Sequence, residues 1–239
     1  RNRYAVTAFN YLAATGVSIF MVTRMSSGLG TLGQGSWELR TLLQKVISND
    51  RITQESLALT WAMVAGVFAG VIFFLAFIAY QVSVNKHGAS ISGAYAKIGI
   101  LVPMLLSLVL WKELPSVIQW SGIALAVFAM FLINYDSFKS KATGIKWSLL
   151  FLFTLGGLAE FSNKLFQNYG IQEQKPVFLV SVFGTAFVFS LITVVIKNRT
   201  IEWQDLGTGI AVGIPNLFSS FFLIRGLESV PAGVAFPVF

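Results

Sequence analysis

GVFAGVIFFLAFIAYQVSVNKHGASISGAYA, residues 66–96, begins with two glycines four residues apart, continues as an apolar run, and ends in a polar break before a second apolar stretch. The segment GIAVGIPNLFSSFFLIRGLESVPAGVAFPVF, residues 209–239, repeats this order of features without a gap. Gly66 falls on Gly209 and Gly70 on Gly213, a pairing that we call the glycine register. Internal repeats in membrane chains are typical of transporters, so we interpret the chain as a duplication.

The composition places the chain in a membrane. Hydrophobic residues make up 55% of the 239 residues and charged residues 11%, with a mean hydropathy of +0.73, whereas soluble domains are about 25% charged. Lipid must therefore be its solvent, and continuous apolar runs of about 20 residues favour helices over a barrel. The chain has no Cys and one His, which excludes disulfides and thiolate metal sites. We predict an all-α polytopic membrane protein without a metal or a cofactor.

The net charge of +7 is spread over the loops. We interpret it as a topology signal and as contact with lipid headgroups rather than as nucleic-acid binding. Lys and Arg are nearly balanced between the two sides of the membrane, so the charge bias does not decide the orientation.

Seven apolar spans and the start of an eighth can be marked along the chain. They are residues 4–23, 58–80, 90–111, 115–134, 146–168, 175–196 and 206–225, with the eighth beginning near Val230. The exception is the segment 24–57, which is Gly/Ser-rich at first and charged later. Apolar residues recur at helical spacing in its part 37–47, which indicates either a helix on the membrane surface or a partly ordered loop.

A second match extends the duplication. Residues 4–18 align with 178–192 without gaps, so that Tyr4 falls on Phe178. Together the two matches pair the first, second and third spans with the sixth, seventh and eighth. The fourth span follows the first set and the fifth precedes the second set, so a whole half would contain five helices. An odd number places the halves in opposite orientations.

We therefore predict two inverted five-helix repeats, with ten transmembrane helices when intact and about eight represented here. Residues 1–135 would be the first repeat lacking its first helix, with 24–57 as an inserted loop. Residues 136–239 would be the second repeat, lacking most of its fourth helix and its fifth.

The segment KHGASISGAYAKIGILVPMLLSLVLWKELPSVIQWSGIALAVFAMFLIN, residues 86–134, resembles the C-terminal part of an EamA domain. The features that carry the resemblance are a polar break before a small-residue helix start, Pro103 within the helix, a short turn with Glu113, and an aromatic–Gly pair at 120–122. Residues 216–238 resemble the corresponding part of a second EamA domain. These domains belong to the drug/metabolite transporter superfamily.

The resemblance implies a function and a location. Such proteins are ten-helix secondary carriers of two inverted halves, which move small metabolites or drug-like compounds by alternating access, often coupled to protons. It further implies a multi-pass protein of the plasma (bacterial inner) membrane, a monomer or homodimer, with a small-molecule substrate and no enzymatic activity. It also places the segment 24–57 in the cytoplasm.

Ionisable residues inside the spans are the first candidates for a substrate or ion pathway, because such residues are costly in a bilayer. Lys97 is either the cationic group of a substrate cavity or a lysine that reaches the headgroups. Glu160 and Lys164 lie four residues apart and share a helix face. Glu160 is either a proton-coupling carboxylate or the partner of Lys164 in a mutually neutralising pair. Asn163 lies between them and could donate to a substrate.

Polar residues at mid-depth complete the candidate pathway. Asn10 and Tyr11 lie in the first span, and Asn216 follows Pro215, which frees a backbone carbonyl one turn earlier. The alternative for these residues is hydrogen bonding between helices.

Two other function classes compete with a carrier. A non-transporting scaffold or receptor would use the 24–57 segment to bind a partner. A membrane enzyme for lipid-linked substrates would need clustered Asp, Glu or His in a loop, and the sequence lacks such a cluster. His87 is expected in a solvated loop.

Overall fold

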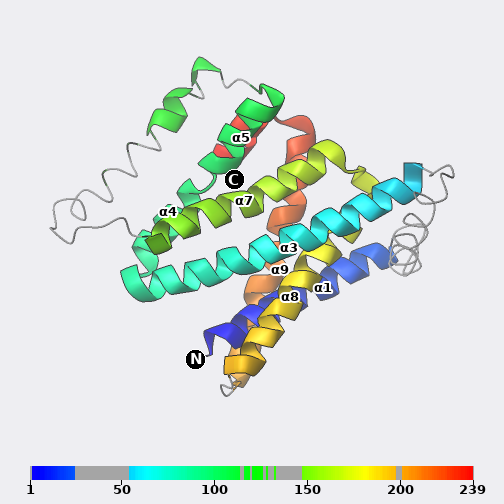
Figure 1. Ribbon diagram of the computed structural model, residues 1–239, viewed down its shortest axis with the longest axis vertical. Helices are drawn as coiled ribbons and strands as arrows, with labels where there is room; N and C mark the ends of the chain where they lie inside the picture. Colours follow the sequence, from blue (N-terminus) through cyan, green and yellow to red (C-terminus); the bar gives the residue numbers. More distant parts are fainter. Residues whose placement is uncertain are drawn as a thin grey trace. The chain divides into compact units, whose positions relative to one another are not determined.

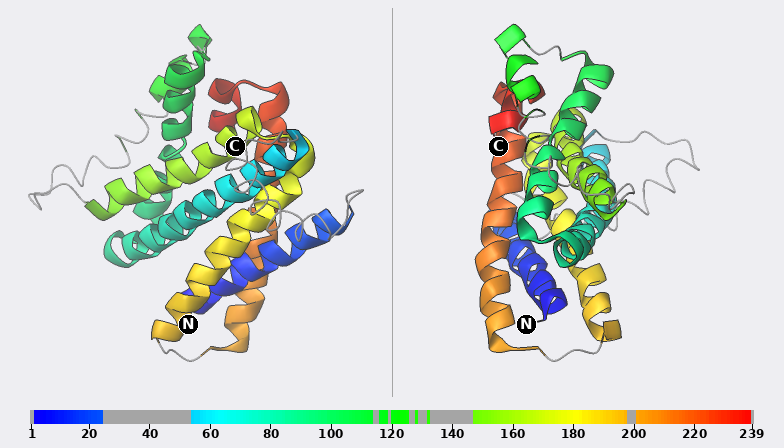
Figure 2. Two further views of the ribbon diagram at one scale, coloured as in Figure 1. Left: turned by 45° about the vertical axis from the view of Figure 1, so that its right-hand side comes forward. Right: turned by 90° about the vertical axis from the view of Figure 1, so that its left-hand side faces the viewer.

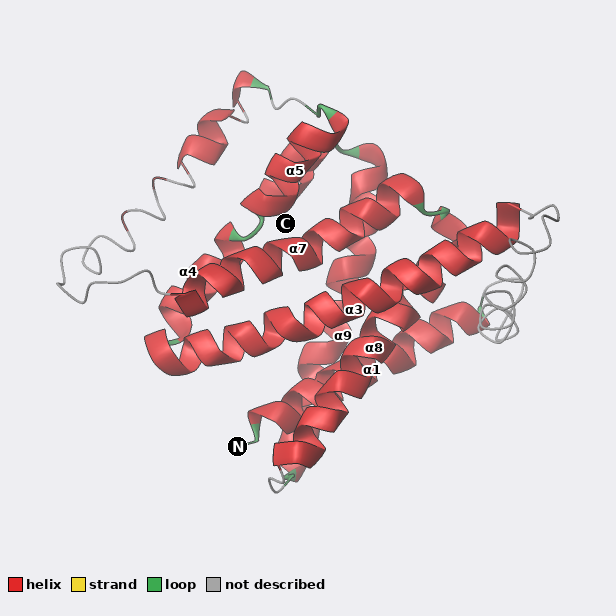
Figure 3. Cartoon of the chain, in the orientation of Figure 1, coloured by secondary structure: helices red, strands yellow, loops and turns green. Residues whose placement is uncertain are grey.

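The computed structural model describes residues 2–24, 54–113, 116–118, 120–125, 128, 132, 147–197 and 201–238. All regular structure in this part of the chain is helical (Figure 3). The all-α class predicted from the composition is confirmed. The expected surface helix at 37–47 lies outside the described residues, as does part of the expected span 115–134.

The helices follow the order shown in Figure 1. They are α1 (Arg3–Thr23), α3 (Gln54–His87), α4 (Ala89–Ile98), α5 (Leu101–Trp111), α7 (Trp147–Tyr169), the 3₁₀ turn η1 (Gln172–Gln174), α8 (Lys175–Lys197), α9 (Trp203–Ser229) and α10 (Ala232–Val238). Among the described residues, six segments are long and apolar enough to cross a membrane: Arg3–Thr23, Leu57–His87, Ala89–Trp111, Trp147–Tyr169, Gln172–Lys197 and Trp203–Ser229. They indicate a multi-pass membrane protein.

Local chemistry explains where two of these helices begin and end. The side chain of Asn2 caps α1 by accepting hydrogen bonds from the backbone N–H groups of Tyr4 and Ala5, at 3.2 and 3.3 Å. The helix α3 extends to His87, beyond the end expected at residue 80. It contains no proline, and it ends before Gly88, whose φ of 84° belongs to the left-handed region that favours glycine.

The expected span 90–111 is confirmed as the segment Ala89–Trp111, but its helix is interrupted at Gly99 and Ile100 between α4 and α5. The cause is Pro103, which lacks an N–H and whose ring clashes with the carbonyl one turn earlier, that of Gly99. Tighter turns replace the regular ladder, with Ile100 N–H donating to Lys97 O and Val102 N–H to Gly99 O.

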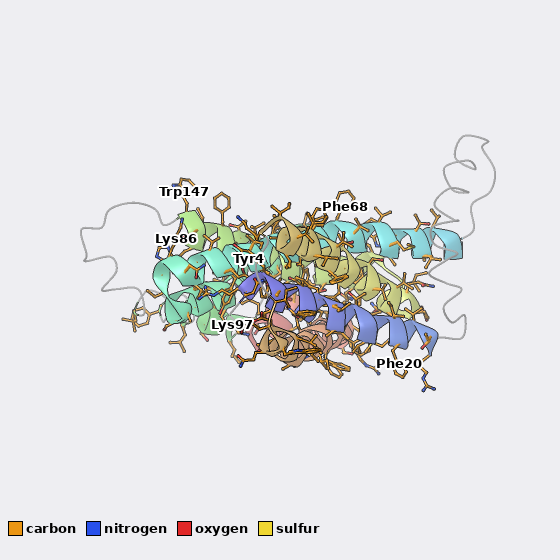
Figure 4. All side chains as sticks on the ribbon, turned by 90° about the horizontal axis from the view of Figure 1, so that it is seen from below. Tyr4, Phe20, Phe68, Lys86, Lys97 and Trp147 are labelled. Carbon is orange, nitrogen blue, oxygen red and sulfur yellow. The ribbon has the colours of Figure 1, made fainter. Side chains whose placement is uncertain are left out.

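Large apolar side chains point outward from their helices, as a lipid environment requires. Phe20, Phe68 and Trp147 are 57%, 69% and 62% exposed and project from the ribbon in Figure 4. Small residues such as Ala14 and Ser18 are fully buried. Helices in lipid pack through small residues, since lipid tails are as apolar as leucine.

The described residues form two compact units. Unit 1 contains Arg1–Phe74 and Leu165–Phe222, and unit 2 contains Leu75–Lys164 and Leu223–Phe239. Each unit therefore combines segments from both halves of the sequence. The units are described separately below.

In unit 1, α3 crosses α8 at a pair of glycines. A Cβ built on Gly66 would lie 2.8 Å from the carbonyl oxygen of Phe178 and would also meet the Cβ of Ser181. A Cβ on Gly70 would meet the carbonyl of Val182. Real Cβ atoms do not approach other atoms so closely, so only glycine fits at these two points.

A second crossing in unit 1, between α9 and α1, repeats this arrangement. A Cβ on Gly209 would lie 2.9 Å from the carbonyl oxygen of Val6 and would meet the Cβ of Phe9, one turn later. A Cβ on Gly213 would meet the carbonyl of Asn10 and, again one turn later, the Cβ of Ala13. The four glycines thus make the same contacts in two places, in the glycine register expected from the sequence.

The helices that receive these glycines, α1 and α8, pack against each other and run in opposite directions, with the start of α1 beside the end of α8 (Figures 1 and 2). Their buried residues also occur at corresponding positions when the two sequences are aligned with Val6 on Phe178. We call this alignment the burial register. In the burial register every buried residue of α1 except Ala8 falls on a buried residue of α8: Ala5 on Val177, Thr7 on Leu179, Asn10 on Val182, Tyr11 on Phe183, Ala14 on Ala186, Ser18 on Ser190 and Val22 on Val194.

The alignment expected from the sequence, with Tyr4 on Phe178, does not fit these faces. It would place the buried Ala14 and Ser18 on Val188 and Ile192, which are 51% and 48% exposed. The glycine contacts support the burial register as well, since the carbonyls that face the first glycine of each pair belong to Val6 and Phe178. The expected alignment of these two helices is therefore wrong.

In unit 2, the break between α4 and α5 packs closely on α7. A Cβ on Gly157 would meet the carbonyl of Gly99 and the Cβ of Val102. A separate apolar cluster joins the end of α9 to α10, with Ile100 packed against it; its members are Leu223, Leu227, Ala232 and Phe236.

Neighbouring glycines of α7 provide a test of this crossing. Gly157→Ala should lower the Tm in detergent, because the added methyl group overpacks the contact with Gly99, at a cost of about 1–3 kcal/mol. Gly156→Ala is the matched control, since a Cβ there has no atom within 4 Å, and alanine is the better helix former. Equal Tm values for the two variants would contradict the close crossing.

Candidate functional site

An ion pair within unit 2 joins α7 to the turn after α5. Lys164 Nζ lies 2.8 Å from Glu113 Oε1, and the side chains are only 3% and 23% exposed. The ammonium group also lies 5.6 Å from the centre of the Trp111 ring, within the range of a cation–π contact. Lys164 is thus held by a carboxylate and an aromatic face in a largely dry setting.

The same carboxylate holds the start of a third helix. Glu113 Oε2 accepts a hydrogen bond of 2.9 Å from the backbone N–H of Ala232, the first residue of α10. The first N–H groups of a helix have no partner within the helix and favour negative charge. Glu113 therefore links the α5 turn, α7 and α10.

A second acidic group, Glu160, lies one turn before Lys164 on α7. Its Oε2 accepts a hydrogen bond of 3.3 Å from Asn163 Nδ2. Asn163 is fully buried, and its Oδ1 has no hydrogen-bond partner among the described residues. Such an oxygen is an acceptor available to a ligand or a water.

Lys97 lies in the last turn of α4, next to the helix break. Its side chain is exposed (Figure 4). A cation at a helix C-terminus is favoured by the helix dipole. The ammonium group of Lys97 is therefore accessible at the end of α4.

The three remaining predicted residues lie in unit 1. Tyr11 is buried, and its hydroxyl donates a 3.0 Å hydrogen bond to the backbone carbonyl of Phe73. Asn216 Nδ2 donates to Asn10 Oδ1 at 3.4 Å. The predicted residues thus form two groups, with Lys97, Glu160, Asn163 and Lys164 in unit 2 and Asn10, Tyr11 and Asn216 in unit 1.

Glu113 was not predicted as the partner of Lys164. The spacing on α7 favoured a pair between Lys164 and Glu160, but Lys164 instead reaches Glu113. The sequence shows Glu113 only as part of a short polar turn at 112–114. That pattern does not reveal which side chain of another helix the carboxylate reaches. His87 also differs from expectation, because it is the last residue of α3 and its Nε2 lies 2.9 Å from Ser148 Oγ.

An apolar groove of about 310 Å³ lies between α1 and α9 in unit 1. Its lining is formed by Phe9, Leu12, Ala13, Gly16, Val17, Leu206, Ile210 and Ile214. It offers no polar side chain to a ligand. In the described part of the chain, no group of three or more His, Cys, Asp or Glu residues could hold a metal ion.

Comparison with known proteins adds no relative: neither a protein-family profile nor a curated protein sequence matches the chain.

The ion pair of Lys164 makes a testable contribution to stability. Glu113→Ala should lower the Tm sharply, because it leaves a buried ammonium without its carboxylate and removes the cap of α10. Loss of one member of a buried pair costs about 3–5 kcal/mol. Adding Lys164→Met to Glu113→Ala should restore part of the loss, since no unpaired charge then remains.

The control for this measurement is Lys112→Met, which removes a charge from the adjacent, exposed position. It should leave the Tm near that of the wild type. If Lys112→Met and Glu113→Ala had equal effects on Tm, the buried ion pair would contribute nothing.

Proposed function

We propose that this chain belongs to a secondary transporter that moves a small metabolite or drug-like compound across a membrane by alternating access. The observation that carries the proposal is the pair of matched glycine crossings in unit 1. Two halves that build the same packing are what an internally duplicated carrier requires, because its halves rock about a central site.

Three contacts in unit 1 support an inverted duplication. Gly66 with Phe178 and Gly209 with Val6 make the same approach to a backbone carbonyl. Tyr11 contacts its own counterpart in the burial register, the aromatic residue of α8, with ring centres 6.3 Å apart. Residues near a two-fold axis meet their own counterparts in this way. The opposite directions of α1 and α8 agree with halves of opposite orientation.

Helix starts support the same pairing. Helix α4 begins at Ala89 and α10 at Ala232, and these two residues correspond in the glycine register. The proposal therefore includes two repeats, in residues 1–135 and 136–239, of the kind that resembles EamA domains. A plasma-membrane location follows from that resemblance.

The charged groups of unit 2 would supply the chemistry of transport. Lys97 is an exposed cation at a helix end, and Glu160 is a half-buried carboxyl within hydrogen-bonding distance of Asn163. Lys164 is already paired with Glu113. We therefore assign substrate attraction to Lys97 and proton coupling to Glu160, and a structural role to Lys164.

Flux into proteoliposomes tests these assignments. The protein, expressed from its complete gene, is screened with labelled amino acids, nucleosides, sugars, organic acids and ethidium. Lys97→Ala should abolish the flux that the wild type shows, because the substrate loses its attracting charge. Lys86→Ala is the control, since it removes the same charge from an exposed helix end. Undiminished flux in Lys97→Ala would remove Lys97 from the pathway.

The role of Glu160 is tested by the driving force. In Glu160→Gln, the dependence of flux on an imposed pH gradient should disappear, since the amide cannot carry a proton. Flux driven by the substrate gradient alone should remain measurable. A Glu160→Gln protein that keeps its response to the pH gradient would rule out this residue as the coupling group.

A further inference from the structure

The two glycine crossings of unit 1 share a backbone arrangement but differ in polarity. At the α9–α1 crossing the side chains include Asn10 and Asn216. The corresponding positions of the α3–α8 crossing hold Val182, by the burial register, and Phe73, by the glycine register. The buried Tyr11 likewise corresponds to a buried phenylalanine of α8. The two amides and the phenol hydroxyl thus lie at the α9–α1 crossing alone, although the α3–α8 crossing has small hydroxyls of its own, Ser181 and Thr185, where the other has Phe9 and Ala13.

Packing alone does not require these polar groups. Val182 and Phe183 are completely buried, and Phe73 is 8% exposed, so apolar residues fill the same positions in the other crossing. Tyr11 and Asn10 are each 1% exposed. The counterparts of Asn10, Tyr11 and Asn216 in the α3–α8 crossing are therefore packed and apolar. Packing does not explain why these three residues are polar.

One polar group at the α9–α1 crossing lacks a hydrogen-bond partner. Asn10 Nδ2 is buried and has no hydrogen-bond partner among the described residues. The bond that Asn10 Oδ1 accepts from Asn216 is long, at 3.4 Å. A buried donor without an acceptor destabilises a fold, and a valine at this position would avoid that loss.

We propose that Asn10, together with Asn216 and Tyr11, binds a neutral oxygen-bearing group of the transported compound, such as an amide carbonyl or a hydroxyl. This inference rests on the proposed transport function and adds one feature of the substrate, a neutral oxygen-bearing group, which the compound carries in addition to the charge that Lys97 attracts. The free Nδ2–H needs an acceptor. None of the three side chains is charged, so a bare ion would lose its hydration here without compensation.

A second difference lies beside Asn216 in α9. Pro215 corresponds to Ile72 in the glycine register, and it removes a backbone N–H from within the helix. The carbonyl of Ala211 is left without its usual partner. The α9–α1 crossing thus differs from its counterpart in the backbone of α9 as well as in its side chains.

Thermal unfolding in detergent gives a first test that does not depend on a substrate. Asn10→Val copies Val182 and should leave the Tm unchanged or raise it. The reverse change, Val182→Asn, should lower the Tm, because it buries an amide where no partner is expected. A Tm for Asn10→Val as low as that of Gly213→Ala would show that Asn10 holds the helices together and would overturn the proposal.

Uptake into proteoliposomes gives the second test, with L-glutamine, glycerol and uridine as neutral probes and L-glutamate and ethidium as charged ones. We expect the wild type to carry at least one neutral probe. Asn10→Val should carry it about tenfold more slowly, the effect of losing one hydrogen bond to the substrate. Tyr11→Phe, which copies Phe183, should slow it to a smaller extent. The Tm of each variant is measured in the same preparation.

The outcomes separate the two proposals. A wild type that carries neither these probes nor any compound of the wider screen contradicts transport, and the site falls with it. Wild-type flux that persists in Asn10→Val contradicts the site alone and leaves transport standing. A wild type that carries only ethidium, which contains no oxygen, contradicts the proposed oxygen-bearing group and leaves transport standing.

Discussion

Direct contact between helix backbones, made possible by glycine, is the constraint on which the rest of this structure depends. In lipid, apolar side chains gain little by leaving their surroundings, so helices associate through close packing instead. At the two glycine pairs of unit 1 a facing helix comes so near that a single methyl group would not fit. These contacts fix how α8 is aligned along α3 and how α1 is aligned along α9. They thereby fix the positions of Asn10 and Tyr11.

The helices were largely predictable, because a bilayer demands about 20 apolar residues per span. The glycine register was also predictable, since glycine spacing is a sharp signal. The alignment of α1 with α8 was not, because identity among apolar residues carries little information. The buried faces and the glycine contacts are what align Ala14 with Ala186 rather than with Val188. Pro103 was visible in the sequence, but whether a proline bends a helix or interrupts it depends on the packing around it.

The candidate site was predictable as a set of residues but not as an arrangement. Helical spacing placed Glu160, Asn163 and Lys164 on one element, and the structure agrees. Spacing cannot tell which side chain from another element reaches them. Lys164 therefore has a partner in Glu113 that is remote in sequence, while Glu160 bonds to a neighbouring amide. The division of roles between these two carboxylates follows from that difference.

The hydrogen bond from Ala232 to Glu113 has a consequence for how the protein is made. The two residues are separated by 119 positions in the chain. During synthesis, Glu113 is therefore translated long before the backbone group that it finally holds. Lys164 is also translated before Ala232. The cap of α10 is thus completed only after both members of the ion pair have been made.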